Sequence, residues 1–178
     1  MNLEEKQLSF DYKYKGRIIN LRVDNALLPN GNQAAREVVE HPGGVCVAAL
    51  NDNNEMYFVR QFRYPYMKTV LEIPAGKLEK GEDPLECGKR ELLEETGAVA
   101  DEYKSLGNLL PSPGYCGETI YMFFARVTGE KEPCPDSDEF LDVIKIPLKK
   151  AVEMVMSGEI EDAKTQTAVM KCAYLSNI

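Results

Sequence analysis

Residues 75–97 read AGKLEKGEDPLECGKRELLEETG, and this stretch decides the fold. A glycine turn leads here into a short helix whose beginning is well marked. Asp83 is a natural N-cap, Pro84 suits the first helical position, and Glu86 has the spacing of a capping box. Gly97 suits the left-handed position just past a helix end. The sequence therefore predicts a helix between Asp83 and Gly97 that follows directly on the turn.

The predicted helix has one inward face and one acidic flank. At roughly 100° per residue, the residues that share the narrow inward face are Leu85, Gly88, Leu92 and Thr96. Glu91, Glu94 and Glu95 fall together on the opposite flank. Glu91 and Glu95 form a like-charge i,i+4 pair, which costs roughly 0.2–0.5 kcal/mol. All three carboxylates lie in the last turns, where the helix dipole disfavours each anion by roughly 0.3–1 kcal/mol.

This unfavourable placement of charge indicates a bound cation. Sequences tend to break local rules at functional sites, and clustered carboxylate oxygens suit hard divalent ions. We therefore expect Mg²⁺ at the acidic flank, with Mn²⁺ as the alternative. The competing interpretation is a solvated acidic face on a charged helix, and the spacing of the surrounding residues decides between the two.

That spacing can be written G-x5-E-x7-R-E-U-x-E-E-x-G-U, where U is a bulky aliphatic residue. The residues that match it are Gly76, Glu82, Arg90, Glu91, Leu92, Glu94, Glu95 and Gly97. The pattern resembles the signature of the Nudix hydrolases, a family that cleaves nucleoside diphosphates linked to another moiety. Only Ala98 departs from it, at a position where a larger aliphatic residue is usual, and this bears on packing rather than chemistry. The resemblance implies a Nudix-type α/β/α sandwich with a mixed central sheet.

Composition and charge narrow the function further. The chain has 178 residues, which fits one domain, and a formal net charge of −8 with no basic run, which argues against a nucleic-acid partner. No apolar run reaches the length that spans a bilayer, and the N-terminal segment lacks the apolar core of a secretory signal. The five cysteines are scattered and odd in number, which indicates reduced thiols in a cytoplasmic protein.

Strand-like and helix-like segments along the chain predict an α+β fold. The predicted strands are residues 7–14, 18–23, 36–41, 45–50, 56–62, 70–73, 104–110, 119–127 and 141–146. Two helices should close the chain, at residues 148–157 and 163–175. We expect residues 1–40 to form an N-terminal β region, with dimerisation as one use of it, and residues 41–178 to form the Nudix hydrolase domain.

Several motifs outside the acidic helix resemble the ADP-ribose pyrophosphatase branch of the family. They are the segments REVVEHPG (36–43), RQFRYP (60–65), LEIPAG (71–76), SPG (112–114) and DAKT (162–165). The resemblance implies that the chain hydrolyses the pyrophosphate bond of ADP-ribose to AMP and ribose 5-phosphate. Two alternatives stay open: a pyrophosphatase for another nucleoside diphosphate sugar, GDP- or UDP-linked, and a non-catalytic module that senses nucleotides.

The expected chemistry is attack of water at phosphorus. Negative charge grows on the phosphate oxygens, and metal ions can neutralise it and lower the pKa of a bound water. Glu91 and Glu95, one helical turn apart, are the first-choice metal ligands, with Glu94 helping in a cluster of several metals. The family resemblance adds the carbonyl oxygen of Ala75 as a further ligand.

Other positions of the signature should support these ligands. Gly76 and Gly97 are expected to shape the turn and the helix end. Glu82 should orient the loop, and Arg90 should hold the glutamates through charge-assisted hydrogen bonds.

The general base must come from a group that can reach the phosphates. The resemblance points to an acidic loop after the strand predicted at 119–127, where Glu139 is favoured and Asp138 and Asp136 come next. Glu94 is the alternative base within the helix.

Four residues are candidates for binding the substrate. Arg36 and Arg63 match branch positions that contact a phosphate or ribose phosphate, although ordinary surface or inter-strand arginines are the alternative. Glu72 either hydrogen-bonds the nucleotide or stabilises a partner subunit, and the sequence does not choose. Pro113 stands at the position of the branch's marker proline.

The branch usually forms homodimers through its N-terminal strands, so the resemblance implies a homodimer here. Phe10, Tyr12 and Tyr14 would share one face of the first strand, because side chains alternate along a strand. One of them is a candidate for stacking on adenine, with core or interface packing as the alternative.

Overall fold

The predicted helices and most of the predicted strands are present in the computed structural model, which describes residues 2–137 and 139–176. The strands are β1 (Lys6–Lys15), β2 (Asn20–Leu27), β3 (Gln33–Glu40), β4 (Gly44–Leu50), β5 (Glu55–Arg63), β6 (Lys68–Glu72), β7 (Ala75–Lys77), β8 (Ala98–Leu109), β9 (Ile120–Glu130) and β10 (Leu141–Pro147). The helices are α1 (Pro84–Thr96), α2 (Leu148–Ser157) and α3 (Ala163–Leu175), with a 3₁₀ turn at Tyr64–Tyr66. No described helix is both long and apolar enough to cross a membrane.

The chain is divided into two units that are interleaved in sequence. The first unit runs to Gly43 and also includes Leu110–Thr119, and the second consists of Gly44–Leu109 and the chain from Ile120 onward. The assignment of residues 1–40 and 41–178 to two regions stays a prediction.

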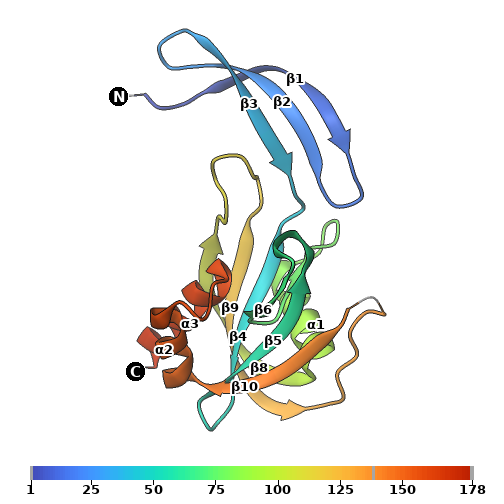
Figure 1. Ribbon diagram of the computed structural model, residues 1–178, viewed down its shortest axis with the longest axis vertical. Coiled ribbons are helices and arrows are strands. Elements are labelled where there is room, and N and C mark those ends of the chain that lie inside the picture. Colours follow the sequence, from blue (N-terminus) through green and yellow to red (C-terminus); the bar gives the residue numbers. More distant parts are fainter. Residues whose placement is uncertain (1, 138, 177–178) are drawn as a thin grey trace. The chain divides into compact units, whose positions relative to one another are not determined.

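The first unit contains the antiparallel sheet β1-β2-β3 (Figure 1). β1 is the edge strand, and it is exposed along nearly all of its length, Phe10 and Tyr14 included. The segment 110–119 bonds to β3, which lies at the opposite edge of the sheet from β1. The backbone N–H of Val39 donates to the Tyr115 carbonyl (2.8 Å), and the Val39 carbonyl accepts from the Gly117 N–H (2.9 Å). The first unit is therefore completed by residues that lie far along the chain.

The second unit is built on one mixed sheet, with the strand order β10-β5-β4-β9-β8 and with β6 and β7 paired to β5 and β4. β4 is its centre, since all seven of its residues are buried. Cys46, Ala48 and Leu50 face α2 and α3, whereas Val47 and Ala49 face α1. Helices thus cover both faces of the sheet, which confirms the predicted α/β/α sandwich (Figure 1).

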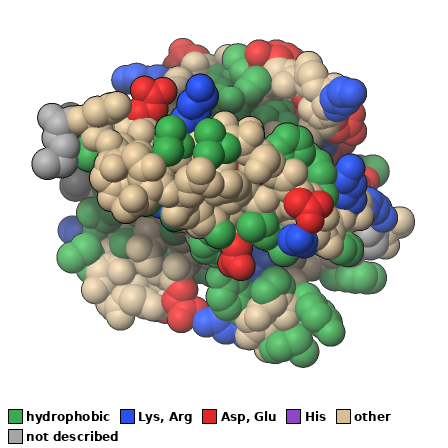
Figure 2. Space-filling model, turned by 90° about the horizontal axis from the view of Figure 1, so that it is seen from above, with side chains coloured by type: hydrophobic (Ala, Val, Ile, Leu, Met, Phe, Trp, Pro, Cys, Tyr) green, Lys and Arg blue, Asp and Glu red, His purple; other side chains and the backbone are tan. Residues whose placement is uncertain are grey.

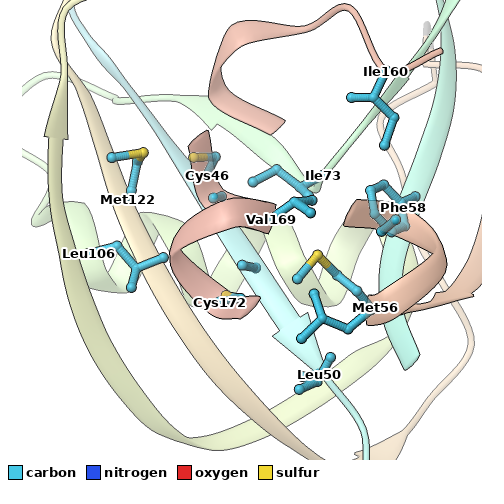
Figure 3. Close-up of a cluster of buried hydrophobic side chains, with 14 of the residues drawn as sticks. Cys46, Leu50, Met56, Phe58, Ile73, Leu106, Met122, Ile160, Val169 and Cys172 are labelled. Carbon is cyan, nitrogen blue, oxygen red and sulfur yellow. The ribbon is translucent and has the colours of Figure 1, made fainter. Parts of the chain in front are cut away.

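The larger hydrophobic cluster lies between this sheet and the closing helices (Figure 3). Val169 of α3 lies beside Ile73 in this cluster (Figure 3). The cluster also holds Cys172 of α3, Cys46 of β4, and Met56 and Phe58 of β5, and all six side chains are fully buried. The two closing helices begin and end where the sequence predicts, and Asp162 caps α3 by accepting from the Thr165 N–H (2.9 Å). The core thus fixes the first turn of α3 against the strand ends near Ile73.

α1 confirms the predicted helix at both ends. Asp83 accepts from the backbone N–H groups of Leu85 and Glu86, and Gly97 ends the helix at φ 71° with its N–H bonded to the Leu93 carbonyl (2.8 Å). The Glu86 side chain pairs with Lys89 (2.7 Å), an i,i+3 contact, so the reciprocal half of the capping box is not formed among the described contacts.

Burial around α1 departs from the sequence expectation. Gly88, Leu92 and Thr96 are buried as predicted, but Cys87 and Glu95 are buried as well, with Glu95 only 3% exposed. The reason is tertiary: β7 packs against α1 and the Ala75 N–H bonds Glu95, so Glu95 is enclosed, whereas the side chain of Glu94 on the same flank is 39% exposed.

The strand predicted at residues 104–110 begins earlier than expected. β8 extends from Ala98, because it pairs with β9 along its whole length, from Ala98 opposite Glu130 to Leu109 opposite Ile120. Its first half, AVADEY, contains two alanines, an aspartate and a glutamate, residue types that are depleted in strands, so pairing with β9 determines where it begins.

Gly97→Ala should lower the free energy of unfolding by more than Gly158→Ala does. Both glycines end a helix at positive φ, 71° and 80°, so alanine at either position meets a strain of about 1–2 kcal/mol. A Cβ at Gly97 would also overlap the Lys131 carbonyl, whereas at Gly158 it would meet nothing within 4 Å. This overlap should add about 1–3 kcal/mol. Urea denaturation measures both losses, and equal losses would show that the Lys131 backbone moves aside freely.

Candidate functional site

The candidate site is built where β6 leads through a turn into β7 and then into α1. β7 pairs with β4, with Ala75 opposite Cys46, and the Pro74 carbonyl accepts from the Val47 N–H (2.9 Å). These bonds hold the turn beside the C-terminal half of α1. The backbone N–H of Ala75 donates to Oε2 of Glu95 (3.0 Å), so the turn and the helix are joined directly.

A second glutamate packs on the same turn. The carboxylate of Glu91 lies so close to the backbone of Gly76 that a Cβ on Gly76 would overlap its Cδ and Oε1 atoms. The Glu91 side chain is 12% exposed. A glycine is therefore needed at position 76 for the Glu91 carboxylate to occupy its place, which gives the first glycine of the signature a physical reason.

The electrostatics of the two glutamates are unusual. Burial raises the pKa of Glu95 to about 8, since the hydrogen bond from Ala75 offsets only part of it and the charges of Glu91 and Glu139 add to the rise. Burial also raises the pKa of Glu91, against the opposing charge of Arg90. A buried carboxylate and a largely covered one, both with raised pKa values beside the same turn, form a place where a cation would stabilise the charged forms. A donor set of carboxylate oxygens fits a hard divalent ion.

Arg90 holds three carboxylates of the signature. Its Nε donates to Glu82 Oε1 (3.1 Å), and its Nη1 lies 2.9 Å from both Glu91 Oε1 and Glu94 Oε2. Glu82 in turn accepts from the Glu79 N–H (2.9 Å), which ties the loop before α1 to the helix. Arg90 and Glu82 therefore brace the loop and the acidic flank together.

The three signature glutamates of α1, Glu91, Glu94 and Glu95, differ in orientation. Glu91 and Glu95 face the β7 turn, whereas the Glu94 carboxylate is bonded to Arg90 and its side chain is 39% exposed. In residues 2–137 and 139–176, no three acidic, histidine or cysteine side chains already converge at metal-ligand spacing. The roles of these glutamates as metal ligands stay predictions.

The loop between β9 and β10 is fastened to the end of α1. The backbone N–H of Lys131 donates to the Gly97 carbonyl (2.8 Å), and that of Cys134 donates to the Glu94 carbonyl (2.9 Å). Further along, Glu139 donates its N–H to Asp136 (2.9 Å), and its negative charge contributes to the raised pKa values of Glu91 and Glu95. The charge of Glu139 thus acts on both Glu91 and Glu95, while Asp138 lies outside the described residues.

Arg63 and Glu72 form a paired unit beside this site. Arg63 Nε and Nη2 donate to the two carboxylate oxygens of Glu72 at 2.5 and 2.7 Å, and Glu72 is 2% exposed. The positive charge of Arg63 offsets part of the raised pKa of Glu95, so the guanidinium lies near the carboxylates of α1.

Lys164, to which the sequence analysis assigned no role, is a third member of this unit. Lys164 in the first turn of α3 donates to Glu72 and is itself only 9% exposed. The signal in the sequence was a lysine two residues after the helix N-cap Asp162, where the helix dipole disfavours a cation.

Arg36 and Pro113 belong to the first unit. Arg36 makes a bidentate ion pair with Glu5, through Nε (2.9 Å) and Nη2 (2.7 Å), and Pro113 is exposed in the bend between Leu110 and Thr119. Their roles in substrate binding stay predictions.

Without metal, the protein should lose stability as the pH rises. The folded state keeps the Glu95 proton up to a pKa of about 8, whereas the ordinary value of 4.5 applies after unfolding. The folded state therefore binds more protons between about pH 4.5 and 8, and the free energy of unfolding falls through this range. Urea denaturation in EDTA at pH 5 and pH 8 measures the fall, which Glu95→Gln should reduce. Equal falls in the wild type and the variant would contradict the prediction.

Comparisons with known proteins agree with this geometry. A model of the NUDIX domain matches residues 40–166. The chain is 42% identical over 171 residues to an ADP-ribose pyrophosphatase of Bacillus subtilis (strain 168), covering 94% of this chain and 92% of that protein. It is 42% identical over 168 residues to a methanol dehydrogenase activator of Bacillus methanolicus, covering 93% and 91%.

A solved structure extends the likeness to the fold. The crystal structure of an ADP compounds hydrolase superposes with a TM-score of 0.86 at 18% identity, over 99% of this chain and 97% of that one. At this identity the likeness concerns the fold. The family model covers the turn, α1 and the first turn of α3, which are the parts that assemble the buried glutamates. The chain belongs to the NUDIX domain family.

Proposed function

We propose that this protein is a metal-dependent hydrolase that cleaves the pyrophosphate bond of ADP-ribose to AMP and ribose 5-phosphate by water attack at phosphorus. The observation that carries the proposal is a pair of glutamates, the buried Glu95 and the largely covered Glu91, that face the β7 turn with raised pKa values. The substrate is proposed from the relative named ADP-ribose pyrophosphatase, which is 42% identical over nearly the whole chain.

Glu91 and Glu95 would hold the metal, with Glu94 and the Ala75 carbonyl as further ligands. We propose Mg²⁺, because all of these donors are oxygen atoms, with Mn²⁺ as the alternative. When bound, the ion supplies positive charge that neutralises the diphosphate oxygens and makes a water molecule more acidic. Arg90 keeps Glu91 and Glu94 in place, and Glu82 keeps the loop in place, because all three carboxylates bond the same guanidinium.

Glu139 is the proposed general base. It is carried by the loop after β9, and its charge acts on both Glu91 and Glu95, which supports a position near the attacking water. Glu94 is the alternative base, but its carboxylate is bonded to Arg90, which leaves it less free to accept a proton.

Arg63 and Arg36 are the proposed contacts to the phosphates. The Arg63 guanidinium bonds Glu72 through Nε and Nη2, yet the side chain is 39% exposed. One edge of the guanidinium therefore faces the protein, and the rest of it is accessible. Both Glu72 oxygens accept bonds from protein groups, which favours a role in holding Arg63 over direct contact with the nucleotide. Pro113 is proposed to shape the segment that approaches the substrate.

A substrate panel tests the function. ADP-ribose in the presence of Mg²⁺ should give the highest kcat/KM, and AMP and ribose 5-phosphate should appear in equal amounts by chromatography. Higher kcat/KM on a GDP- or UDP-linked sugar would favour the alternative enzyme, and activity on nucleoside triphosphates alone would contradict the branch. Absence of hydrolysis on every substrate would favour the non-catalytic module that senses nucleotides.

A homodimer is proposed from the first unit. β1 is a ten-residue edge strand with exposed Phe10 and Tyr14, and exposed edges and apolar side chains are common at contacts between copies. Figure 2 shows hydrophobic side chains among acidic and basic ones on one face of the molecule. Analytical ultracentrifugation tests the dimer, and a monomer at micromolar concentration would contradict it. A cytoplasmic location is proposed from the five cysteines, which are all free.

A further inference from the structure

Lys164 is placed against two ordinary preferences. It is only 9% exposed, although lysine is almost never fully buried without a partner. It also follows the N-cap Asp162 in the first turn of α3, where the helix dipole favours anions. A side chain held so unfavourably indicates that its charge is needed at this place.

The contacts of Lys164 show which carboxylates its charge neutralises. Its Nζ donates to Glu72 Oε2 and to Asp162 Oδ1 (3.0 Å). Glu72, 2% exposed, receives the Arg63 fork on its two oxygens. The four side chains therefore form a chain of alternating charge from Asp162 through Lys164 and Glu72 to Arg63, with a formal sum of zero.

The same helical turn also holds the backbone that leads to the glutamates. Thr165 Oγ1 donates to Asp162 Oδ2 (2.6 Å) and accepts from the Ile73 N–H (3.0 Å). Two residues later, Ala75 donates its N–H to Glu95. The first turn of α3 is thus bonded to the segment between Glu72 and Ala75 at both the side chains and the main chain.

We propose that Lys164 is a positioning residue for substrate binding, which acts by sharing the charge of Glu72 so that Arg63 keeps its attraction for a phosphate oxygen. With Lys164 present, the group of four is neutral and the accessible side of Arg63 presents a positive charge. Without Lys164, the three remaining side chains, Asp162, Glu72 and Arg63, carry a net charge of −1, which weakens the attraction of Arg63 for an anion. The inference rests on the proposed function, because it assigns Arg63 to the substrate.

Lys164→Met tests the inference, since methionine keeps an unbranched side chain only one atom shorter than lysine and removes the charge. KM for ADP-ribose should rise about 10–100-fold, as is typical when a supporting residue is lost, while kcat stays within about threefold. Lys164→Arg should recover part of the loss, because it restores the charge. Lys68→Met is the matched control: Lys68 pairs with Glu161 on the neighbouring surface, both side chains are about half exposed, and KM should not change.

A double variant keeps the test decisive if Lys164→Met does not fold. Glu72→Gln combined with Lys164→Met removes both charges, so no unpaired carboxylate is left buried. If Lys164 acts through Glu72, adding Lys164→Met to Glu72→Gln should change KM by less than about threefold. A further rise of about tenfold, or an unchanged KM in a folded Lys164→Met, would overturn the inference. A wild type that does not hydrolyse ADP-ribose would instead overturn the proposed function.

Discussion

Glu95→Gln should lower kcat by about 10³-fold while the protein stays folded. Glu95 is the most buried carboxylate of α1, and its proposed contribution is a charged oxygen that holds the metal. Loss of charge stabilisation by a metal removes several kcal/mol of transition-state binding, and each 1.36 kcal/mol is about tenfold in rate. Glutamine has nearly the same shape and keeps a carbonyl oxygen that can accept the Ala75 N–H, so the turn should remain bonded to α1.

Steady-state kinetics with Mg²⁺ and thermal unfolding measure the two parts of this prediction. Glu86→Gln is the matched control, because it makes the same change on the same helix at a side chain that is 63% exposed and bonded only to Lys89 among the described residues. It should leave kcat within about twofold, as surface changes do. Unchanged turnover in Glu95→Gln would remove Glu95 from the ligand set.

Gly76→Ala should lower kcat/KM by about 10²-fold with little loss of stability. The new methyl group would overlap the Glu91 carboxylate, which is the far end of a flexible side chain and can rotate away at small cost. The fold then survives, but Glu91 leaves the place that faces the β7 turn. Displacing a reacting or metal-holding group by about 1 Å can cost about 10²-fold in rate. Kinetics and urea denaturation should therefore give opposite answers, a large loss of activity and a small loss of stability.

Gly129→Ala is the control for this substitution. Gly129 lies in β9 of the same sheet, and a Cβ there would meet nothing within 4 Å. It should leave both kcat/KM and stability near the wild-type values. Full activity in Gly76→Ala would show that Glu91 is not required at its present position.

The elements with local signals were predicted well from the sequence. α1 begins after Asp83 and ends at Gly97 because the caps are encoded in neighbouring residues, and α2 and α3 begin and end at the predicted residues. The beginning of β8 could not be predicted, because it depends on pairing with β9 rather than on the weak strand preference of its own residues.

The candidate site was predicted in composition but only partly in arrangement. The spacing of Glu91, Glu94 and Glu95 placed them on one flank, yet the burial of Glu95 depends on β7, which crosses that flank only in the folded chain. The sequence analysis expected Arg90 to hold the glutamates, and Arg90 is hydrogen-bonded to Glu94. The close contact of the Glu91 carboxylate with Gly76 is a tertiary feature that the spacing does not indicate. Lys164 joins Glu72 across 92 positions of sequence, and such a contact has no local signature.

The return of residues 110–119 to the first unit has a consequence for biosynthesis. Val39 at the end of β3 uses both its N–H and its carbonyl to bond residues 115 and 117. A nascent polypeptide that has emerged only as far as Gly43 therefore leaves these groups to water, and they find their native partners after roughly 70 further residues have been translated. At about 5–20 residues per second, the ribosome takes several seconds to deliver them. The N-terminal strands are synthesised first, but their last native hydrogen bonds form only after residue 117 has been translated.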